Sequence, residues 1–284
     1  MLRSFASSSE LLDAGKIWRA MLRVVAVIPA RMGSSRFPGK PLAPLLGRPM
    51  IEHVVRRARM CHSLDALYVA TCDEEIRAAV ESCGCPVIMT SIEHERASDR
   101  VAEAAERFEA EIVLMIQGDE PMITPGMLDA ALAPMRLDSS VVCVNLARRI
   151  ESLDEYADPN TIKVVTDVHG DALYFSRSPI PALARGAELQ GGPPQLFKQV
   201  CVIPFRRDFL REFARLPPTP LECAESIDML RVIEHGGRVR MVETDVDTHA
   251  VDTGADLRLV ELLMKDDPLL LTYEEHVARR GERL

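Results

Sequence analysis

The chain has 284 residues, of which 47% are hydrophobic, and its formal net charge at pH 7 is −9. This length accommodates one large domain or a core with an appended lobe, and the hydrophobic content is enough for a buried core. The acidic balance excludes a general nucleic-acid-binding protein, and no run of residues is long and apolar enough to span a membrane.

Residues 1–22 read differently from the rest of the chain. Ser7-Ser8-Ser9 could cap a short helix, and Met21 stands just before the first apolar run. We expect an N-terminal extension here, either the product of an upstream start or a loosely ordered arm, and we assign it no chemistry. The seven cysteines have no regular spacing, which indicates free thiols in a reducing cytoplasm rather than a zinc site.

Between residues 23 and 150, short apolar runs alternate with amphipathic stretches. The apolar runs predict strands over 23–28, 66–71, 86–89, 111–117 and 141–146. Helical spacing predicts helices over 49–60, 73–82, 98–108 and 125–135, with Asp73 and Ser98 as N-terminal caps. This alternation predicts an α/β fold with a doubly wound, mostly parallel sheet.

The alternation ends after residue 150, and a smaller α+β lobe is predicted over about 150–235. Its predicted elements are a hairpin over 163–166 and 172–175, a mobile loop over 190–195, a strand over 199–205 and a helix over 221–234. A strand over 238–243 and a helix over 253–264 follow. We therefore expect a single domain over residues 23–284 with this lobe inserted into it.

The loop that follows the first strand carries three cations, Arg31, Arg36 and Lys40, spaced between glycines and serines. Inward-pointing backbone N–H groups and fixed positive charges suit a polyphosphate. It is not a Walker A loop, because five residues separate Gly33 from Gly39 and Pro41 replaces the Ser or Thr that follows the lysine. The sequence predicts a triphosphate loop of another kind.

Two aspartates are candidate metal ligands. Asp119 lies just past the carboxyl end of the central strand, where open α/β sheets bind ligands, and Gly118 before it lets the backbone approach a ligand closely. An acid near a triphosphate is a natural magnesium ligand, although the same residues also suit a plain turn. Asp252 precedes a helix and could serve either as its cap or as a second carboxylate on the metal.

An ordered series of short motifs resembles the 3-deoxy-manno-octulosonate (Kdo) cytidylyltransferase family, the CMP-Kdo synthetases, within the sugar-acid cytidylyltransferases. The motifs run in order from about residue 24 to 260. They include Arg36-Phe37-Pro38-Gly39-Lys40, Gln117-Gly118-Asp119-Glu120-Pro121, Asp158-Pro159-Asn160 and Val251-Asp252-Thr253. The resemblance implies a Rossmann-like nucleotidyltransferase fold, a homodimer formed through the lobe, and transfer of CMP from CTP to a 2-keto-3-deoxy sugar acid for lipopolysaccharide or another surface glycan.

The resemblance also implies roles for individual residues. The expected catalytic residues are Arg31, Lys40, Asp119 and Asp252, and the last two are expected to bind Mg²⁺. The expected nucleotide site comprises Pro29, Ala30, Arg31, Met32, Gly33, Ser34, Ser35, Arg36, Lys40, Ala70, Thr71, Asp73, Ser98 and Gln117. The expected sugar-acid site comprises Arg100, Gln117, Arg177, Gln199 and Asp228.

The chain departs from the family where sugar contacts are expected. The usual Ser-Gly-Thr-Glu-Arg run becomes Arg96-Ala97-Ser98-Asp99-Arg100, a histidine and a tyrosine become Gln199 and Ile203, and a Glu-Gln pair becomes Asp228-Met229. Loss of side chains that pair with sugar hydroxyls strongly alters how a site discriminates between sugar substrates. We therefore hypothesise that the acceptor is a relative of Kdo such as 8-amino-Kdo.

Two alternatives stay open at this point. One is a cytidylyltransferase for a nine-carbon ulosonic acid, although those sequences more often carry Gly-Gly-Ser-Lys in the phosphate loop. The other is a nucleotide-binding homologue without catalytic activity, which the intact Lys40, Asp119 and Asp252 disfavour.

Overall fold

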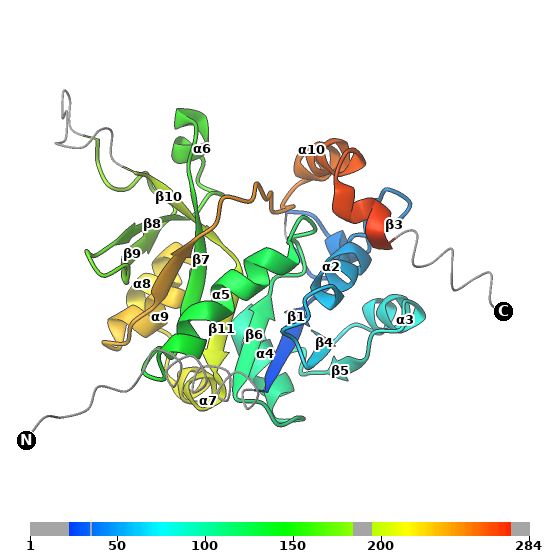
Figure 1. Cartoon of the computed structure of the whole chain (residues 1–284), viewed down its shortest axis with the longest axis horizontal. Helices are drawn as coiled ribbons and strands as arrows, with labels where there is room; N and C mark the ends of the chain where they lie inside the picture. The colour runs from blue at the N-terminus through cyan, green and yellow to red at the C-terminus, as the bar shows by residue number, and fades with distance from the viewer. Residues whose placement is uncertain (1–22, 35, 184–194, 274–284) are drawn as a thin grey trace, which may run out of the picture.

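The structure is a computed structural model and describes residues 23–34, 36–183 and 195–273 (Figure 1). The expectations for residues 1–22, for Ser35 and for the loop over 190–194 lie outside this range. Within the described part of the chain, none of the helices combines the length and the hydropathy that crossing a bilayer requires.

The first sheet has five strands in the order β11-β6-β1-β4-β5. Strands β1 (Val24–Pro29), β4 (Ala66–Thr71), β5 (Val87–Met89) and β6 (Ile112–Ile116) are parallel to one another, and β11 (Val202–Arg206) runs antiparallel to β6. Every residue of β1 and β6 is buried, as expected for strands covered on both faces.

Helices cover both faces of this sheet. Alternate residues of β1 pack with α2 (Met50–Arg59), α3 (Glu74–Ser82) and α5 (Pro125–Leu137) on one face. The other residues of β1 pack with α4 (Ala97–Ala105) and α7 (Arg207–Arg215) on the opposite face. The predicted α/β class with a doubly wound, parallel sheet is confirmed.

The second sheet has the order β12-β7-β10-β8-β9 and is mainly antiparallel. Its strands are β7 (Val144–Arg149), β8 (Lys163–Thr166), β9 (Ala172–Ser176), β10 (Phe197–Val200) and β12 (Arg240–Glu243). Strands β8 and β9 form the predicted hairpin. The remaining elements are η1 (Lys40–Leu42), β2 (Pro44–Leu45), β3 (Arg48–Pro49), α6 (Leu153–Ala157), α8 (Pro220–Glu225), α9 (Met229–Glu234) and α10 (Gly254–Lys265).

Two predicted elements are each split in the structure. The strand predicted over 199–205 is divided at Cys201, so that β10 pairs in the second sheet and β11 pairs in the first. The helix predicted over 221–234 is divided into α8 and α9 at Ser226, whose φ is +55°. Apolar periodicity is the same on both sides of each break, so the pattern could not reveal it.

A buried histidine joins the helix α2 to the end of the described chain. His53 has no exposed surface, its Nε2 lies 2.7 Å from the carbonyl oxygen of Leu45, and its Nδ1 lies 2.7 Å from the hydroxyl of Tyr273. Since the carbonyl can only accept, Nε2–H donates to it and Nδ1 accepts from the tyrosine. Burial lowers the pKa of His53 to about 4, so the imidazole is neutral.

We predict that this histidine makes folding sensitive to mild acid. Between pH 6.5 and 4, His53 is protonated in the unfolded state but not in the folded state. The free energy of unfolding therefore falls as pH falls. The expected loss at pH 5 is about 2 kcal/mol relative to pH 7.5. Urea unfolding at both pH values should show a smaller loss in His53→Gln; equal losses in the two proteins would contradict the prediction.

Candidate functional site

A cleft opens where the carboxyl ends of the neighbouring strands β1 and β6 meet, as the strand order of an open parallel sheet leads one to expect. A smaller part of about 360 Å³ adjoins the loop after β1, and a larger part of about 620 Å³ extends toward the second sheet. Arg31, Arg36 and Asp119 border both parts.

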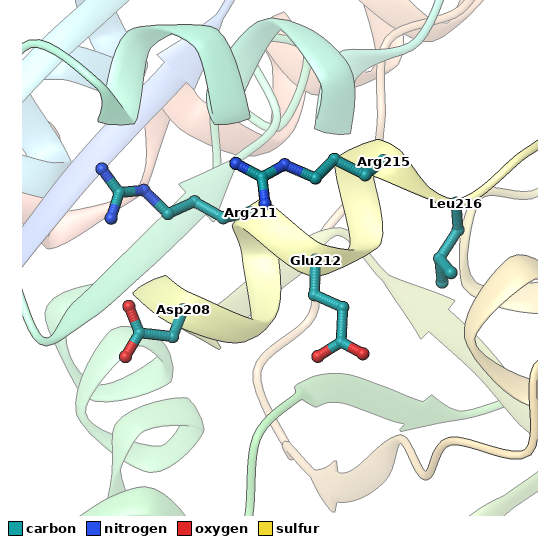
Figure 2. A pocket seen from close by; sticks show the side chains of 5 residues that line it. All are labelled: Asp208, Arg211, Glu212, Arg215 and Leu216. Carbon is teal, nitrogen blue, oxygen red and sulfur yellow. The ribbon is translucent and has the colours of Figure 1, made fainter.

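A separate hollow lies along the outer face of α7, with Asp208, Arg211 and Glu212 beside it (Figure 2). Arg211 already pairs with Glu106, Nε to Oε1, at 2.7 Å. This hollow contains none of the residues that the sequence assigns to the site, and we assign it no function.

The loop after β1 is held to the sheet by backbone bonds. The amide of Ala30 donates to the carbonyl of Ala70 at 2.9 Å, and the amide of Gly39 donates to the carbonyl of Met32 at 3.0 Å. Gly39 has a φ of +73°, a left-handed conformation that glycine adopts at little cost. These contacts close the loop into a turn immediately before η1.

The prediction that Asp73 caps its helix is wrong. Asp73 does occupy the position before α3, but its side chain makes no capping bond. Its carboxylate instead accepts a hydrogen bond from the amide of Met32 at 2.8 Å. Asp73 therefore fixes the loop after β1 in place from the neighbouring strand.

The two predicted metal-ligand aspartates meet at one ammonium group. The Nζ of Lys40 lies 2.5 Å from Oδ2 of Asp119, 3.1 Å from Oδ1 of Asp252 and 3.0 Å from the carbonyl oxygen of Val251. Arg36 adds an ion pair with Asp252 at 2.9 Å. Residues that are 79 and more positions apart in sequence thus form one charge cluster.

The cluster keeps its lysine charged. Burial alone lowers the pKa of Lys40, but the charges and hydrogen bonds of Asp119 and Asp252 outweigh burial and raise the pKa above its ordinary value of 10.5. The ammonium therefore offsets part of the negative charge of the two carboxylates at any physiological pH.

Asp119 and Asp252 also suit a magnesium ion. Among the residues that the structure describes, no group of three or more His, Cys, Asp or Glu side chains could hold a metal by itself. Magnesium, however, is usually bound through one or two carboxylates together with substrate phosphates. Two carboxylates within reach of one atom are thus a fitting donor set for an ion that enters with a triphosphate.

Gly118, the residue before Asp119, is packed closely against the end of β1 and against α2. A Cβ atom on Gly118 would lie 3.0 Å from the backbone carbonyl oxygen of Pro29 and 3.4 Å from Ile51. A side chain here would require the end of β1 or the side chain of Ile51 to shift. Gly118 also borders the smaller part of the cleft, where the sequence places its ligand.

The predicted nucleotide residues divide into two groups. Those that border the smaller part of the cleft are Pro29, Ala30, Arg31, Gly33, Ser34, Arg36, Lys40 and Gln117. The others, Met32, Ala70, Thr71, Asp73 and Ser98, border neither part. Ala70 and Thr71, at the end of β4, have no exposed surface because the structure around them covers their side chains.

Ser98 is directed away from the nucleotide part. The expectation that it caps its helix is wrong, because α4 begins at Ala97 and Ser98 lies inside its first turn. Ser98 is fully buried, and its hydroxyl donates to Oδ2 of Asp228 at 2.6 Å. It therefore supports a residue of the larger part of the cleft.

Three of the predicted sugar-acid residues, Arg177, Gln199 and Asp228, border the larger part. The Nε of Arg177 donates to the carbonyl of Glu225 at 2.8 Å, and the amide of Gln199 donates to Oδ1 of Asn145 at 2.6 Å. Gln117 borders both parts of the cleft. The ends of β6 and β9, the strand β10 and the start of α9 thus bring these residues to one wall.

Arg100 differs from the others because its guanidinium is already engaged. It borders the smaller part, yet it is only 2% exposed. The guanidinium donates to Oγ1 of Thr90 at 2.5 Å and to the carbonyls of Ser91 and His94 at 3.2 and 3.3 Å. In this structure Arg100 fixes the loop before α4.

Arg96 and Glu120 are among the cleft residues that the predictions omitted. Arg96 borders both parts, and the only signal for it was its departure from the family's usual run. Glu120 is 4% exposed and accepts the hydroxyl of Thr248 at 2.8 Å. Burial raises the pKa of Glu120 to about 7. Nothing in the sequence pattern indicates that Glu120 is buried, because it stands among residues that suit a turn.

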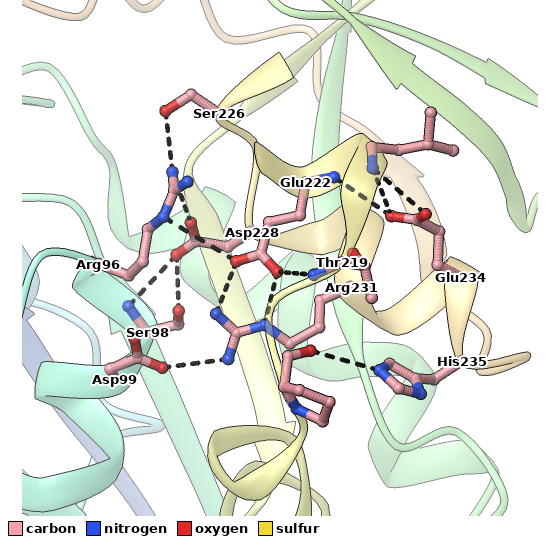
Figure 3. Close-up of polar contacts among 12 residues, drawn as sticks. Arg96, Ser98, Asp99, Thr219, Glu222, Ser226, Asp228, Arg231, Glu234 and His235 are labelled. Carbon is pink, nitrogen blue, oxygen red and sulfur yellow. Dashed lines mark hydrogen bonds and ion pairs between the residues drawn. The ribbon is translucent and has the colours of Figure 1, made fainter. Parts of the chain in front are cut away.

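A buried ion network stabilises the wall of the larger part (Figure 3). Arg231 on α9 donates to both carboxylate oxygens of Glu222 on α8, at 2.6 and 2.7 Å, and pairs with Asp99 on α4 at 3.3 Å. Both Arg231 and Glu222 are almost fully buried. Because Arg231 contacts both Glu222 and Asp99, the network holds α4 against the break between α8 and α9. Removing one partner of such a pair would leave a buried charge uncompensated.

The comparisons with known proteins agree with each other. Residues 25–244 match the family described as Cytidylyltransferase. Proteins from Geobacter metallireducens and Geobacter sulfurreducens, both named 3-deoxy-manno-octulosonate cytidylyltransferase, are 45% and 44% identical to this chain. The two alignments cover 86% and 84% of this chain and 99% and 98% of the relatives.

Solved structures give the same result. A structure of CMP:2-keto-3-deoxy-manno-octonic acid synthetase complexed with CTP is 42% identical, has a TM-score of 0.79, and is matched over 86% of this chain and 98% of its own. A putative glucose-1-phosphate thymidylyltransferase from Bacillus anthracis has a TM-score of 0.62 at 13% identity over 86% of this chain and 96% of its own, which supports the fold alone.

Proposed function

The chain belongs to the cytidylyltransferase family, among its 3-deoxy-manno-octulosonate members, and we propose that it transfers CMP from CTP to Kdo with release of pyrophosphate. The observation that carries this proposal is the meeting of Lys40, Asp119 and Asp252 at the edge of the sheet where the cleft opens. The product would supply the sugar acid in activated form for lipopolysaccharide synthesis.

The reaction is a nucleotidyl transfer. The oxygen of the anomeric hydroxyl forms a bond to the α-phosphorus of CTP, and the bond from that phosphorus to the oxygen bridging to the β-phosphorus breaks. Pyrophosphate leaves with the electron pair, and the hydroxyl proton passes to solvent. Both substrates are anions, so holding them together and neutralising their charge is the main task of the protein.

The residues of the loop after β1 suit this task. Arg31, Arg36 and Lys40 border the smaller part of the cleft, where they would hold the triphosphate and stabilise the charge that develops on pyrophosphate. Asp119 and Asp252 would hold Mg²⁺, which would supply Lewis-acid stabilisation of the phosphate oxygens. Gln117, at the junction of the two parts, would orient the acceptor.

One observation favours a second acceptor, 8-amino-Kdo. Four of the positions that depart from the family's usual residues border the larger part of the cleft: Gln199, Ile203, Asp228 and Met229. Changes that gather on one wall of a binding site alter its selectivity for the ligand.

Pyrophosphate release tests the function and its rivals together. Wild-type protein, CTP and Mg²⁺ are incubated with Kdo, with 8-amino-Kdo and with a nine-carbon ulosonic acid. We expect turnover with Kdo or its amino analogue, and the ratio of the two kcat/KM values identifies the acceptor. Activity confined to the nine-carbon acid, or none with any acceptor while CTP still binds, would reject the proposal.

Asp119→Asn should lower kcat by on the order of a hundredfold or more, because the amide removes one negative charge from the proposed magnesium site. The measurement is steady-state pyrophosphate release at saturating Mg²⁺. Lys40→Ala is the matched comparison, since it removes the other member of the 2.5 Å pair. It should raise the KM for CTP more than it lowers kcat. Wild-type kcat in Asp119→Asn would refute the assignment.

We also propose that the protein is cytoplasmic and forms a homodimer through the segment 150–235. All seven cysteines are free thiols, which supports a reducing compartment. Strand β9 of this segment lies at an edge of the second sheet, and its Leu173 is 57% exposed. Ala172 at the start of β9 donates to the carbonyl of Val239, so this edge is already paired in part. The exposed Leu173 is the feature that suits an apolar contact with a second copy.

The dimer makes a prediction about mass. Sedimentation equilibrium at micromolar concentration should give about twice the 31.5 kDa of the chain. Leu173→Lys should shift the mass toward the monomer, because a charge at this position opposes an apolar contact between two copies. Leu262→Lys on α10, where the leucine is 63% exposed, serves as the control and should leave the mass unchanged. A monomeric wild type would contradict the proposal.

A further inference from the structure

A ulosonic acid acceptor brings a second anion to the site, and the inference that follows rests on the proposed function. Its carboxylate is bonded to the same carbon as the attacking hydroxyl. That carboxylate must therefore lie where the acceptor part of the cleft joins the triphosphate part. A cation is needed at this junction besides those that hold the phosphates.

The other cations around the acceptor either are engaged by the protein or lie away from the junction. Arg100 is 2% exposed and donates to Thr90, Ser91 and His94. Lys198 pairs with Glu155 at 2.5 Å. Arg177 donates to two backbone carbonyls and borders the larger part of the cleft without reaching the smaller one.

Arg96 stands at the junction. It is the residue before α4, it borders both parts of the cleft, and a quarter of its side chain is exposed. Figure 3 shows its guanidinium directed across the gap from α4 toward the break between α8 and α9. Nη1 donates to Oγ of Ser226 at 2.9 Å.

The acids beside Arg96 leave its donors available. Asp228 approaches to 3.6 Å and Glu222 to 3.9 Å, both longer than ordinary hydrogen bonds. Glu222 is occupied by Arg231 at 2.6 Å, and Asp228 accepts the hydroxyl of Ser98 with its other oxygen. A guanidinium has five N–H donors, so Arg96 retains several for a ligand.

We propose that Arg96 binds the carboxylate of the sugar-acid acceptor and selects acids over neutral sugars. A guanidinium matches a carboxylate in two-point geometry, which would orient the anomeric hydroxyl as well as hold the acid. Asp228, directed to the same gap, keeps the guanidinium in place when no acceptor is bound.

The test compares wild type, Arg96→Gln and Arg96→Lys with Kdo and with its methyl ester at the carboxylate. With Kdo, Arg96→Gln should lower kcat/KM for the acceptor by about 10- to 100-fold, as expected for loss of a hydrogen bond to a charged group. The KM for CTP should change by less than about threefold. Arg96→Lys should restore part of the loss, because it keeps the charge but not the fork.

The ester distinguishes a contact with the carboxylate from a structural effect. It lacks the negative charge, so wild type and Arg96→Gln should use it, or be inhibited by it, within about threefold of each other. An equal loss with Kdo and the ester, or a loss confined to the KM for CTP, would overturn the proposal. Arg211→Gln on the outer face of α7 is the matched control and should change neither acceptor (Figure 2).

Direct binding keeps this inference separate from the proposed function. If the wild type releases no pyrophosphate, the function fails, yet Kdo binding can still be measured by calorimetry in both proteins. At least tenfold weaker binding to Arg96→Gln supports Arg96, and equal binding overturns it. Thermal unfolding of Arg96→Gln should match that of Arg211→Gln, since the buried Arg231–Glu222 pair is intact in both.

Discussion

The rest of the site depends on the ammonium of Lys40. It joins the loop after β1 to Asp119 at the end of β6 and to Asp252 before α10, so three distant segments share one point. Two carboxylates that contact the same ammonium lie close enough to repel each other. The lysine offsets that repulsion before any metal or substrate arrives. The same lysine is therefore both a structural counter-charge and a proposed ligand for phosphate.

The acceptor wall arises from two interruptions of regular structure. At Cys201 the chain leaves the second sheet and enters the first. Gln199 therefore lies beside β7 and Ile203 beside β6, and both border the larger part of the cleft. At Ser226 the helix breaks, so that Asp228 turns toward the cleft instead of continuing along α8. The parallel strands thus form the nucleotide side, and the two breaks form the side where the acceptor would bind.

The sequence could predict the class of fold and the loop cations, because these depend on local pattern. Short apolar runs marked β1, β4 and β6, and the strand ends placed Asp119 at the correct edge. It could not predict the breaks at Cys201 and Ser226, because apolar periodicity does not record which sheet a strand joins. Nor could it reveal that the hydroxyl of Ser98 points toward Asp228, since a helix boundary moved by one residue turns a side chain to another face.

Several charged side chains near the site form hydrogen bonds to the backbone. Asp73 holds the amide of Met32, Arg100 holds the loop before α4, and the buried Lys163 donates to the carbonyls of Asp158, Thr161 and Arg177 at 2.8, 2.7 and 2.5 Å. Loops that face two anionic substrates cannot rely on packing for rigidity, because one side of them must stay open. Charge-assisted bonds to backbone supply that rigidity instead. A charged residue within a motif therefore identifies the neighbourhood of the ligand, whereas unoccupied donors, as on Arg96, identify the group that can bind it.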